Sequence, residues 1–381
     1  MLNDEWKNIV AGAKLEEFTS ISTMSQYKIQ VALEILEGCS YMCPGCFVKR
    51  KGNWNPKSID MFHQLATELE GREDIVLDDL VIGPTDFYGA ENLLYVINDV
   101  KLAEAILMMP KDNRNVQHNC SILGSLSEKD IATKIKQIEA SLLGKVVEAW
   151  DVQIAIDINR LLDDVDYRIA LEDRLRTFDE SSLNFEISMA TNIVQGIEDR
   201  IYEAIDLVRN EYNTVIEILP SVVRSFDHGP KHGEKLFEWN EMLSRLASDP
   251  KRFKSKFHFL QGDLSHKAIN YTVVNIHQGK FFMSPFIYEN AQIYSEAFLI
   301  STYQQQLSLV DSILYHKEMF VKWQIEKSSA KECGTCKYLN ICAHRLVPRV
   351  MDTAFANRSE CILNKDVIAL FDYEVYDGHR K

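Results

Sequence analysis

The sequence contains no hydrophobic stretch long enough to cross a membrane. A transmembrane helix needs about 20 consecutive apolar residues, and the longest candidate, residues 96–109, is interrupted by charged side chains. Internal repeats and low-complexity segments are also missing. No secretory signal peptide is recognisable at the N-terminus. We therefore expect a globular protein with no membrane partner, located in the cytoplasm.

Basic residues are in the minority. The chain has 42 Lys and Arg against 56 Asp and Glu, which gives a formal net charge of −14. Binding to DNA or RNA needs a basic surface that contacts phosphates, so the composition argues against nucleic acid as a partner. Hydrophobic residues make up 46% of the 381 residues. That length and composition predict a domain of about 200–250 residues and a smaller one.

The histidines form no recognisable metal-binding set. His228 and His232 are four residues apart, but Gly229 and Pro230 between them exclude a helical zinc face. The cysteines, in contrast, are clustered. Seven of the eight fall into two groups, which are Cys39, Cys43 and Cys46, and Cys333, Cys336, Cys342 and Cys361. The remaining Cys120 is interpreted as a small buried hydrophobic residue and not as a reactive thiol.

The first group has the spacing C-x3-C-x2-C and follows a strand-like run over residues 28–36. Three thiolates bind three irons of a [4Fe–4S] cluster and leave the fourth iron for a ligand from outside the protein. A structural zinc ion needs four ligands, and no fourth cysteine or histidine follows closely. A zinc site and an ordinary four-ligand cluster remain the alternatives. The loop position supports a ligand site, because ligands of α/β folds bind at the carboxyl ends of strands.

This motif resembles that of the radical S-adenosylmethionine (SAM) family, in which the amino and carboxylate groups of SAM chelate the free iron. The resemblance implies that SAM is cleaved reductively to a 5′-deoxyadenosyl radical, which then abstracts hydrogen from the substrate. It also implies an electron donor such as flavodoxin or ferredoxin. The sequence identifies no catalytic acid and no residue that quenches the substrate radical.

The second group supplies four thiolates, enough for either a second [4Fe–4S] cluster or zinc. Its spacing resembles the auxiliary-cluster region of the SPASM subfamily of radical SAM enzymes. Two cysteines of that pattern are replaced, one by Leu346 and one by Ser284, which follows a predicted hairpin over residues 275–285 with Gly279 in its turn. The resemblance therefore implies a single auxiliary cluster, bound by Cys333, Cys336, Cys342 and Cys361.

Strand-like and helix-like segments alternate along the first half of the chain, which predicts an α/β fold with a parallel sheet. The predicted helices cover residues 58–69, 127–143 and 197–208. The predicted strands cover residues 28–36, 80–83, 116–123, 152–157, 185–189 and 214–219. Six such units suit the partial (β/α)6 TIM-like barrel of the radical SAM family. We predict an N-terminal preface over residues 1–26, the barrel over 27–235, and a SPASM-like auxiliary-cluster domain over 236–381.

The resemblance also indicates which residues contact SAM. Several candidates have a second interpretation: Asp86 as a turn or cap residue, Arg168 as the helical partner of Asp164, and Phe47 as part of the core. The predicted SAM-binding residues are Phe47, Gly83, Asp86, Asp157, Arg168 and Leu219.

The substrate is predicted from the same resemblance. SPASM enzymes mostly modify peptides, so a peptide is the first expectation. The alternative enzyme oxidises or rearranges a small metabolite by the same radical chemistry. The alternative without catalysis is an iron–sulfur or zinc scaffold that binds a partner protein.

Overall fold

The computed structural model describes residues 27–38, 56–83, 85–121, 128–192, 200–212, 216–219, 271–283, 300 and 308–316. All seven cysteines of the two predicted groups lie outside the described residues, and so does Phe47. The predicted preface and the predicted domain boundary after residue 235 lie outside them as well. The domain division therefore stays a prediction.

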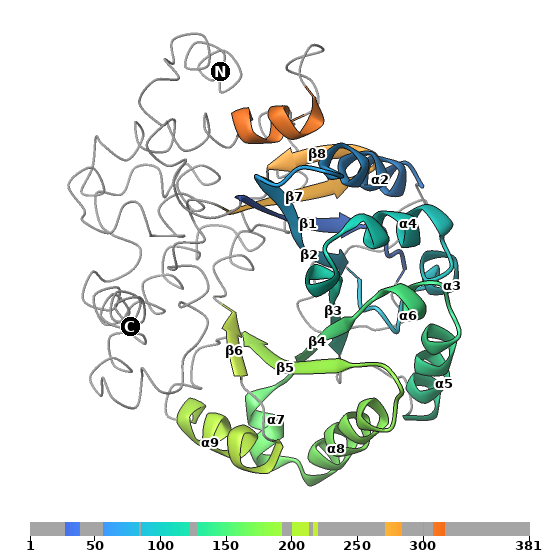
Figure 1. The fold of residues 1–381 in the computed structure, drawn as a ribbon. Coiled ribbons are helices and arrows are strands. Elements are labelled where there is room, and N and C mark those ends of the chain that lie inside the picture. Colours follow the sequence, from blue (N-terminus) through green and yellow to red (C-terminus); the bar gives the residue numbers. More distant parts are fainter. Residues whose placement is uncertain are drawn as a thin grey trace, which may run out of the picture.

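A single eight-stranded sheet forms the centre of the fold, with the strand order β6-β5-β4-β3-β2-β1-β7-β8 (Figure 1). The pairs from β6 through to β7 are parallel, and only β8 is antiparallel to its neighbour. The strands are β1 (Tyr27–Glu34), β2 (Ile75–Gly83), β3 (Asn115–Ser121), β4 (Ala149–Ala155), β5 (Phe185–Asn192), β6 (Ile216–Leu219), β7 (Tyr271–His277) and β8 (Lys280–Met283).

The six strands predicted from the sequence are confirmed, and the α/β class with them. The second strand begins earlier than expected, at Ile75, because a register shift opposite Gln30 accommodates Asp78 and Asp79 within the strand. A bulge of this kind inserts a residue without ending the pairing on either side.

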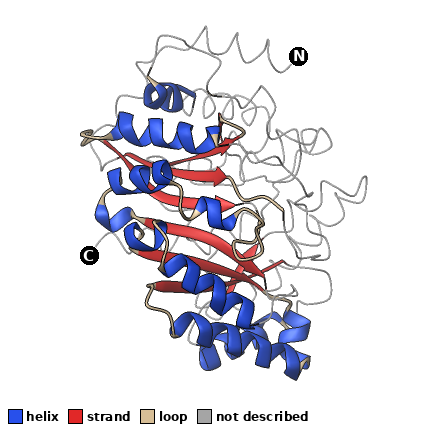
Figure 2. Ribbon diagram, turned by 90° about the vertical axis from the view of Figure 1, so that its right-hand side faces the viewer, coloured by secondary structure: helices blue, strands red, loops and turns tan. Residues whose placement is uncertain are grey.

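Helices cover one face of the curved sheet, which we call the outer face (Figures 1 and 2). They are α2 (Lys57–Leu69), α3 (Leu93–Val96), α4 (Val100–Met108), α5 (Glu128–Glu139), α6 (Leu143–Val146), α7 (Ile158–Asp163), α8 (Val165–Asp179) and α9 (Ile201–Tyr212), with a 3-10 turn at Lys111–Asn113. The helix expected over 127–143 ends at Glu139. Ser141 ends it by donating a side-chain hydrogen bond to the Ile138 carbonyl and accepting one from the Gly144 N–H.

The two faces of the sheet differ in polarity. On β1, Ile29, Val31 and Leu33 are fully buried in the outer-face core. Because side chains alternate along a strand, the residues between them point to the opposite, inner face. That face carries polar residues on several neighbouring strands, among them Lys28, Gln30, Glu34, Asp78, Gln117, Asn119, Gln153, Ser188 and Asn275.

An aromatic cluster lies under the helices at the middle of the sheet. His118 is fully buried beside Phe87 and Trp150, and its Nε2 lies 2.9 Å from the Tyr88 hydroxyl oxygen. Burial lowers the pKa of His118 to about 3, because the charged imidazolium would lose its hydration. His118 is therefore a neutral core residue.

The β7–β8 hairpin extends the barrel sheet. The predicted hairpin is confirmed, with Gln278 and Gly279 in its turn. Gly279 adopts φ +72° and donates its N–H to the Ser58 hydroxyl at 3.0 Å, and a Cβ there would collide with Lys57. The hairpin thus packs against the start of α2, while β7 pairs in parallel with β1. A strand from the predicted second domain therefore belongs to the same sheet as the barrel strands.

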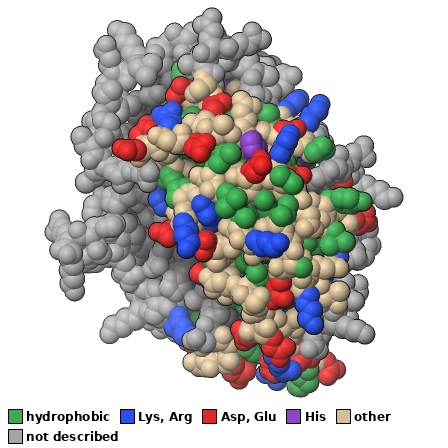
Figure 3. Space-filling view, turned by 45° about the vertical axis from the view of Figure 1, so that its right-hand side comes forward, with side chains coloured by type: hydrophobic (Ala, Val, Ile, Leu, Met, Phe, Trp, Pro, Cys, Tyr) green, Lys and Arg blue, Asp and Glu red, His purple; other side chains and the backbone are tan. Residues whose placement is uncertain are grey.

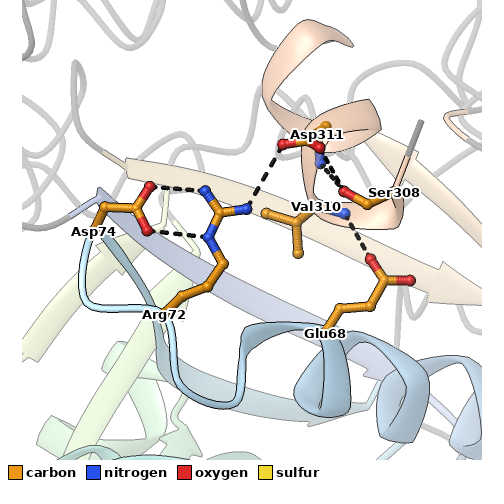
Figure 4. A network of polar contacts seen from close by, with 6 residues as sticks. All are labelled: Glu68, Arg72, Asp74, Ser308, Val310 and Asp311. Atoms are coloured by element: carbon orange, nitrogen blue, oxygen red, sulfur yellow. Dashed lines mark hydrogen bonds and ion pairs between the residues drawn. The ribbon is translucent and has the colours of Figure 1, made fainter.

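The helix over residues 309–316 is attached to the end of α2 by polar contacts (Figure 4). Glu68 accepts a hydrogen bond from the backbone N–H of Val310 at 3.2 Å, at the start of that helix. Arg72 forms two hydrogen bonds to Asp74, at 2.7 and 3.0 Å, and lies 3.6 Å from Asp311. These contacts join two segments that are more than two hundred residues apart in the sequence.

The helix-covered surface mixes acidic, basic and hydrophobic side chains (Figure 3). Leu94, Tyr95, Val100 and Leu107 are the large exposed hydrophobic residues of the α3–α4 region. Among the described residues, no helix combines the length and the hydropathy that a membrane crossing requires.

We predict that Glu68→Ala lowers the free energy of unfolding by about 1 kcal/mol, because the Val310 N–H loses its acceptor at a helix start. Chemical denaturation measures this change, and hydrogen exchange at Val310 should become faster. Glu70→Ala is the matched control, since Glu70 is an exposed neighbour with the same charge. Equal effects of the two substitutions would contradict the assignment.

A second prediction concerns acid stability. Below pH 6.5 the unfolded chain takes up a proton at His118 that the folded chain does not take up until about pH 3. Stability is therefore lost as pH falls, by about 1.4 kcal/mol per pH unit from this residue. His118→Gln should reduce the slope between pH 6 and 4 by that amount, measured by urea denaturation. An unchanged slope in His118→Gln would contradict the assignment of a neutral, buried imidazole.

Candidate active site

The carboxyl ends of the parallel strands meet at one edge of the sheet. Glu34 at the end of β1 lies in register with Gly83 of β2 and His277 of β7. Further along the edge, Ala155 lies between Ser121 and Ala190, and Asn192 pairs with Leu219. Ligands of such folds bind at this edge. The described segment that leads to the first cysteine group ends at this edge, at Gly38.

Backbone contacts fix the segment that leads into the cysteine loop. The N–H groups of Ile35 and Leu36 both donate to the Gly83 carbonyl, at 3.0 and 3.3 Å. The Thr85 hydroxyl donates to the Leu36 carbonyl at 3.1 Å. The segment is thus held against the end of β2, the next strand of the sheet.

Asn92 holds the same segment from the other side. Its Nδ2 donates to the Ile35 carbonyl at 2.7 Å, and its Oδ1 accepts from the Glu37 N–H at 2.9 Å. Gly38 adopts φ +57°, and a Cβ there would collide with the side chain of Glu91. A glycine is therefore required directly before Cys39, both for its backbone conformation and for the close approach of Glu91.

Gly83 lies where the sequence predicts a contact with SAM. No atom of the described residues lies within 4 Å of the position that a Cβ would take there, but the residue is buried, so its contact with SAM stays a prediction. Asp86 accepts a hydrogen bond from the Gly89 N–H at 2.8 Å, and its charge acts on the buried Cys120 and Tyr88. It thus serves as a turn residue, the second interpretation of its role. Its contact with SAM stays a prediction.

The other predicted SAM-binding residues are placed by backbone and helix contacts. Asp157 caps α7, since its Oδ1 accepts from the Arg160 N–H at 3.1 Å. Arg168 lies on α8, where its charge acts on the Tyr212 hydroxyl, and Asp164 pairs instead with Arg160 at 3.0 Å. The side chain of Leu219 is outside the described residues. Their contacts with SAM remain predictions.

The structure confirms the prediction that Cys120 is a small buried residue and not a reactive thiol. It is almost completely buried, and burial raises the pKa of its thiol to about 12. Arg174 donates to its sulfur at 3.9 Å. Since the thiolate is the nucleophile and the metal ligand, Cys120 is not a cluster ligand. In the described part of the chain, no three His, Cys, Asp or Glu side chains gather in a way that could hold a metal ion.

Three polar residues on the inner face, Glu34, His277 and Asn275, were not predicted as site residues from the sequence. Glu34 lies 3.1 Å from Nδ1 of His277, and its side chain is only 6% exposed. Asn275 lies two residues before His277 on the same face. The sequence of β1 did indicate a polar face, because Lys28, Gln30 and Glu34 alternate with aliphatic residues. The pairing of β7 with β1 had no signal in the sequence.

No protein-family model matches the sequence, and no curated protein resembles it closely enough to count as a match. Solved structures do match. Two are structures of anSMEcpe, an anaerobic sulfatase-maturating enzyme of the radical SAM class. The first, with bound AdoMet, has a TM-score of 0.52 and 11% identity over 93% of this chain and 96% of the other. The second, with AdoMet and the Cp18Cys peptide, also has a TM-score of 0.52 and 11% identity, over 92% and 97%.

Streptococcus suis SuiB bound to S-adenosylmethionine matches with a lower TM-score of 0.42 and 12% identity, over 91% of this chain and 79% of the other. The two anSMEcpe structures define the class of fold. The chain has the fold of a radical SAM enzyme, with a mostly parallel, TIM-like α/β sheet covered by helices.

We predict that Asn92→Ala lowers the free energy of unfolding by about 2 kcal/mol, because the Ile35 carbonyl and the Glu37 N–H lose their partner. Asn98→Ala is the control, since Asn98 is exposed and donates only to the Leu94 carbonyl within its own helical turn. Denaturant unfolding of both variants measures the difference. If Asn98→Ala costs as much, the side chain of Asn92 does not hold the segment.

Proposed function

We propose that this chain is a radical SAM enzyme that acts on a peptide. One observation carries the proposal. The C-x3-C-x2-C motif follows β1 in the sequence, directly after a segment that Gly83, Thr85 and Asn92 hold at the carboxyl edge of the sheet. Three thiolates at the ligand-binding edge of this fold suit an iron–sulfur cluster with one open iron.

The residues at this edge fit the cluster and SAM. Cys39, Cys43 and Cys46 would provide the soft donor set, and Gly38, which adopts φ +57°, directly precedes the first of them. Gly83 has no side chain at the end of β2, so its main chain would meet a ligand there. Phe47, Asp86, Asp157, Arg168 and Leu219 complete the proposed set of SAM-contacting residues. When bound, the cluster and SAM supply the 5′-deoxyadenosyl radical.

The protein's own part is to position the substrate. The outer face of the sheet is filled by the hydrophobic core, while the inner face presents polar residues such as Gln117, Asn119 and Glu34. Such a face binds a substrate with many hydrogen-bonding groups more readily than an apolar one. The peptide in the structure of anSMEcpe, which has this fold, also supports a peptide substrate.

The second cysteine group, Cys333, Cys336, Cys342 and Cys361, is proposed to bind a closed auxiliary [4Fe–4S] cluster. Four thiolates leave no open iron, so this cluster would carry electrons or support the structure. Flavodoxin or ferredoxin is the proposed electron donor, and the cytoplasm the proposed location.

The proposal is tested on anaerobically reconstituted protein with dithionite and SAM. We expect about eight irons per chain for two [4Fe–4S] clusters, and 5′-deoxyadenosine as a product. Cys361→Ala should lose about half of the iron and still form deoxyadenosine. Cys120→Ala is the matched control, since it also removes one thiol and should keep all of the iron. Zinc in place of iron, or no deoxyadenosine from the loaded protein, would favour the scaffold alternative.

A further inference from the structure

Asn275 is a buried side chain on the inner face of β7. It lies opposite Ala32 of β1 and Phe282 of β8. Its strand neighbours Val274 and Ile276 belong to the outer-face core, so alternation directs Asn275 inward. The residue is 1% exposed, and within the described part of the chain neither its Oδ1 nor its Nδ2 has a hydrogen-bond partner.

An unpaired carboxamide in this position is unusual. Buried polar side chains are nearly always hydrogen-bonded, because an unmet donor or acceptor destabilises the folded state. Asn92 is a structural asparagine of the same fold and offers a comparison. It is also buried, but both of its polar atoms bind main-chain groups. The two polar atoms of Asn275 are therefore available to a partner from outside the described fold.

A second polar atom points to the same place. Oε2 of Glu34 lies 3.1 Å from Nδ1 of His277, whereas its Oε1 is buried without a hydrogen-bond partner among the described residues. Glu34 and His277 are register partners, and Asn275 lies two residues before His277. The carboxylate and the carboxamide thus share the carboxyl half of the inner face. Their register neighbours Ala32 and Gly83 are small residues.

The free atoms define the chemistry of the ligand. The Asn275 Nδ2 needs an acceptor, its Oδ1 needs a donor, and Oε1 of Glu34 needs a further N–H or ammonium group. A peptide main chain carries all three, since each amide has a C=O and an N–H and the preceding amine or amide supplies another. We propose that Asn275 and Glu34 form a subsite for a main-chain amide of the peptide substrate, an assignment that rests on the proposed function.

The first test compares two leucine substitutions of similar shape in the full-length protein. Asn275→Leu removes an unpaired polar group, so its thermal midpoint should rise by about 2 °C or more. Asn92→Leu removes a paired one, so its midpoint should fall. A fall for Asn275→Leu as well would mean that Asn275 is already paired within the protein, which overturns the proposal.

The second test observes binding directly and does not depend on how the variant folds. In protein labelled with 15N-asparagine, the side-chain resonances of Asn275 are those lost in Asn275→Asp. Glycinamide, a fragment of a peptide main chain, should shift them in a saturable way. Glycine methyl ester has the same amine and a carbonyl but no amide N–H, so it should bind more weakly than glycinamide.

The results of these binding measurements distinguish a failure of the proposed subsite from a failure of the proposed radical chemistry. If glycinamide leaves the Asn275 resonances unmoved, only a buried water occupies the position and the subsite is rejected. If SAM shifts them and glycinamide does not, the position belongs to SAM, and the subsite is again rejected. If glycinamide binds but the wild-type chain forms no deoxyadenosine, the amide subsite stands and the radical chemistry is discarded.

Discussion

The candidate site depends on the pairing of β1 with a parallel strand on each side. Because β2 and β7 both run in the direction of β1, their carboxyl ends lie beside its own, at Gly83 and His277. Hydrogen bonds from Ile35 and Leu36 to Gly83 then continue this order beyond the strand. The segment that leads to Cys39 is thereby held at the edge where parallel sheets bind ligands.

The two faces of the sheet meet different physical requirements. Aliphatic and aromatic residues on the outer face pack under the helices, and His118 stays neutral there because a charge would be desolvated. The inner face is free of that requirement. It carries polar residues in register across neighbouring strands, including the pair Glu34 and His277.

Much of the fold could be predicted from the sequence, because periodicity is a local property. The six barrel strands, helix α2 and the hairpin turn at Gly279 follow from residues close together in the chain. The observed elements differ from the predicted ones where a side chain or a bulge overrides the local sequence pattern. Ser141 ends α5 early, and the bulge opposite Gln30 carries β2 past two aspartates. For the site, the cysteine spacing by itself predicts a cluster with an open iron.

The sequence by itself determined the α/β class and the burial of Cys120, and it predicts the donor sets of the two cysteine groups. Only the tertiary structure decided which residues share the inner face. Glu34, Asn275 and His277 come together because β7, far along the chain, pairs with β1 in one register. A shift of one residue would turn all of the β7 side chains to the other face. Such register depends on the packing of the hairpin against α2, through contacts between Gly279 and Ser58, and no local pattern encodes it.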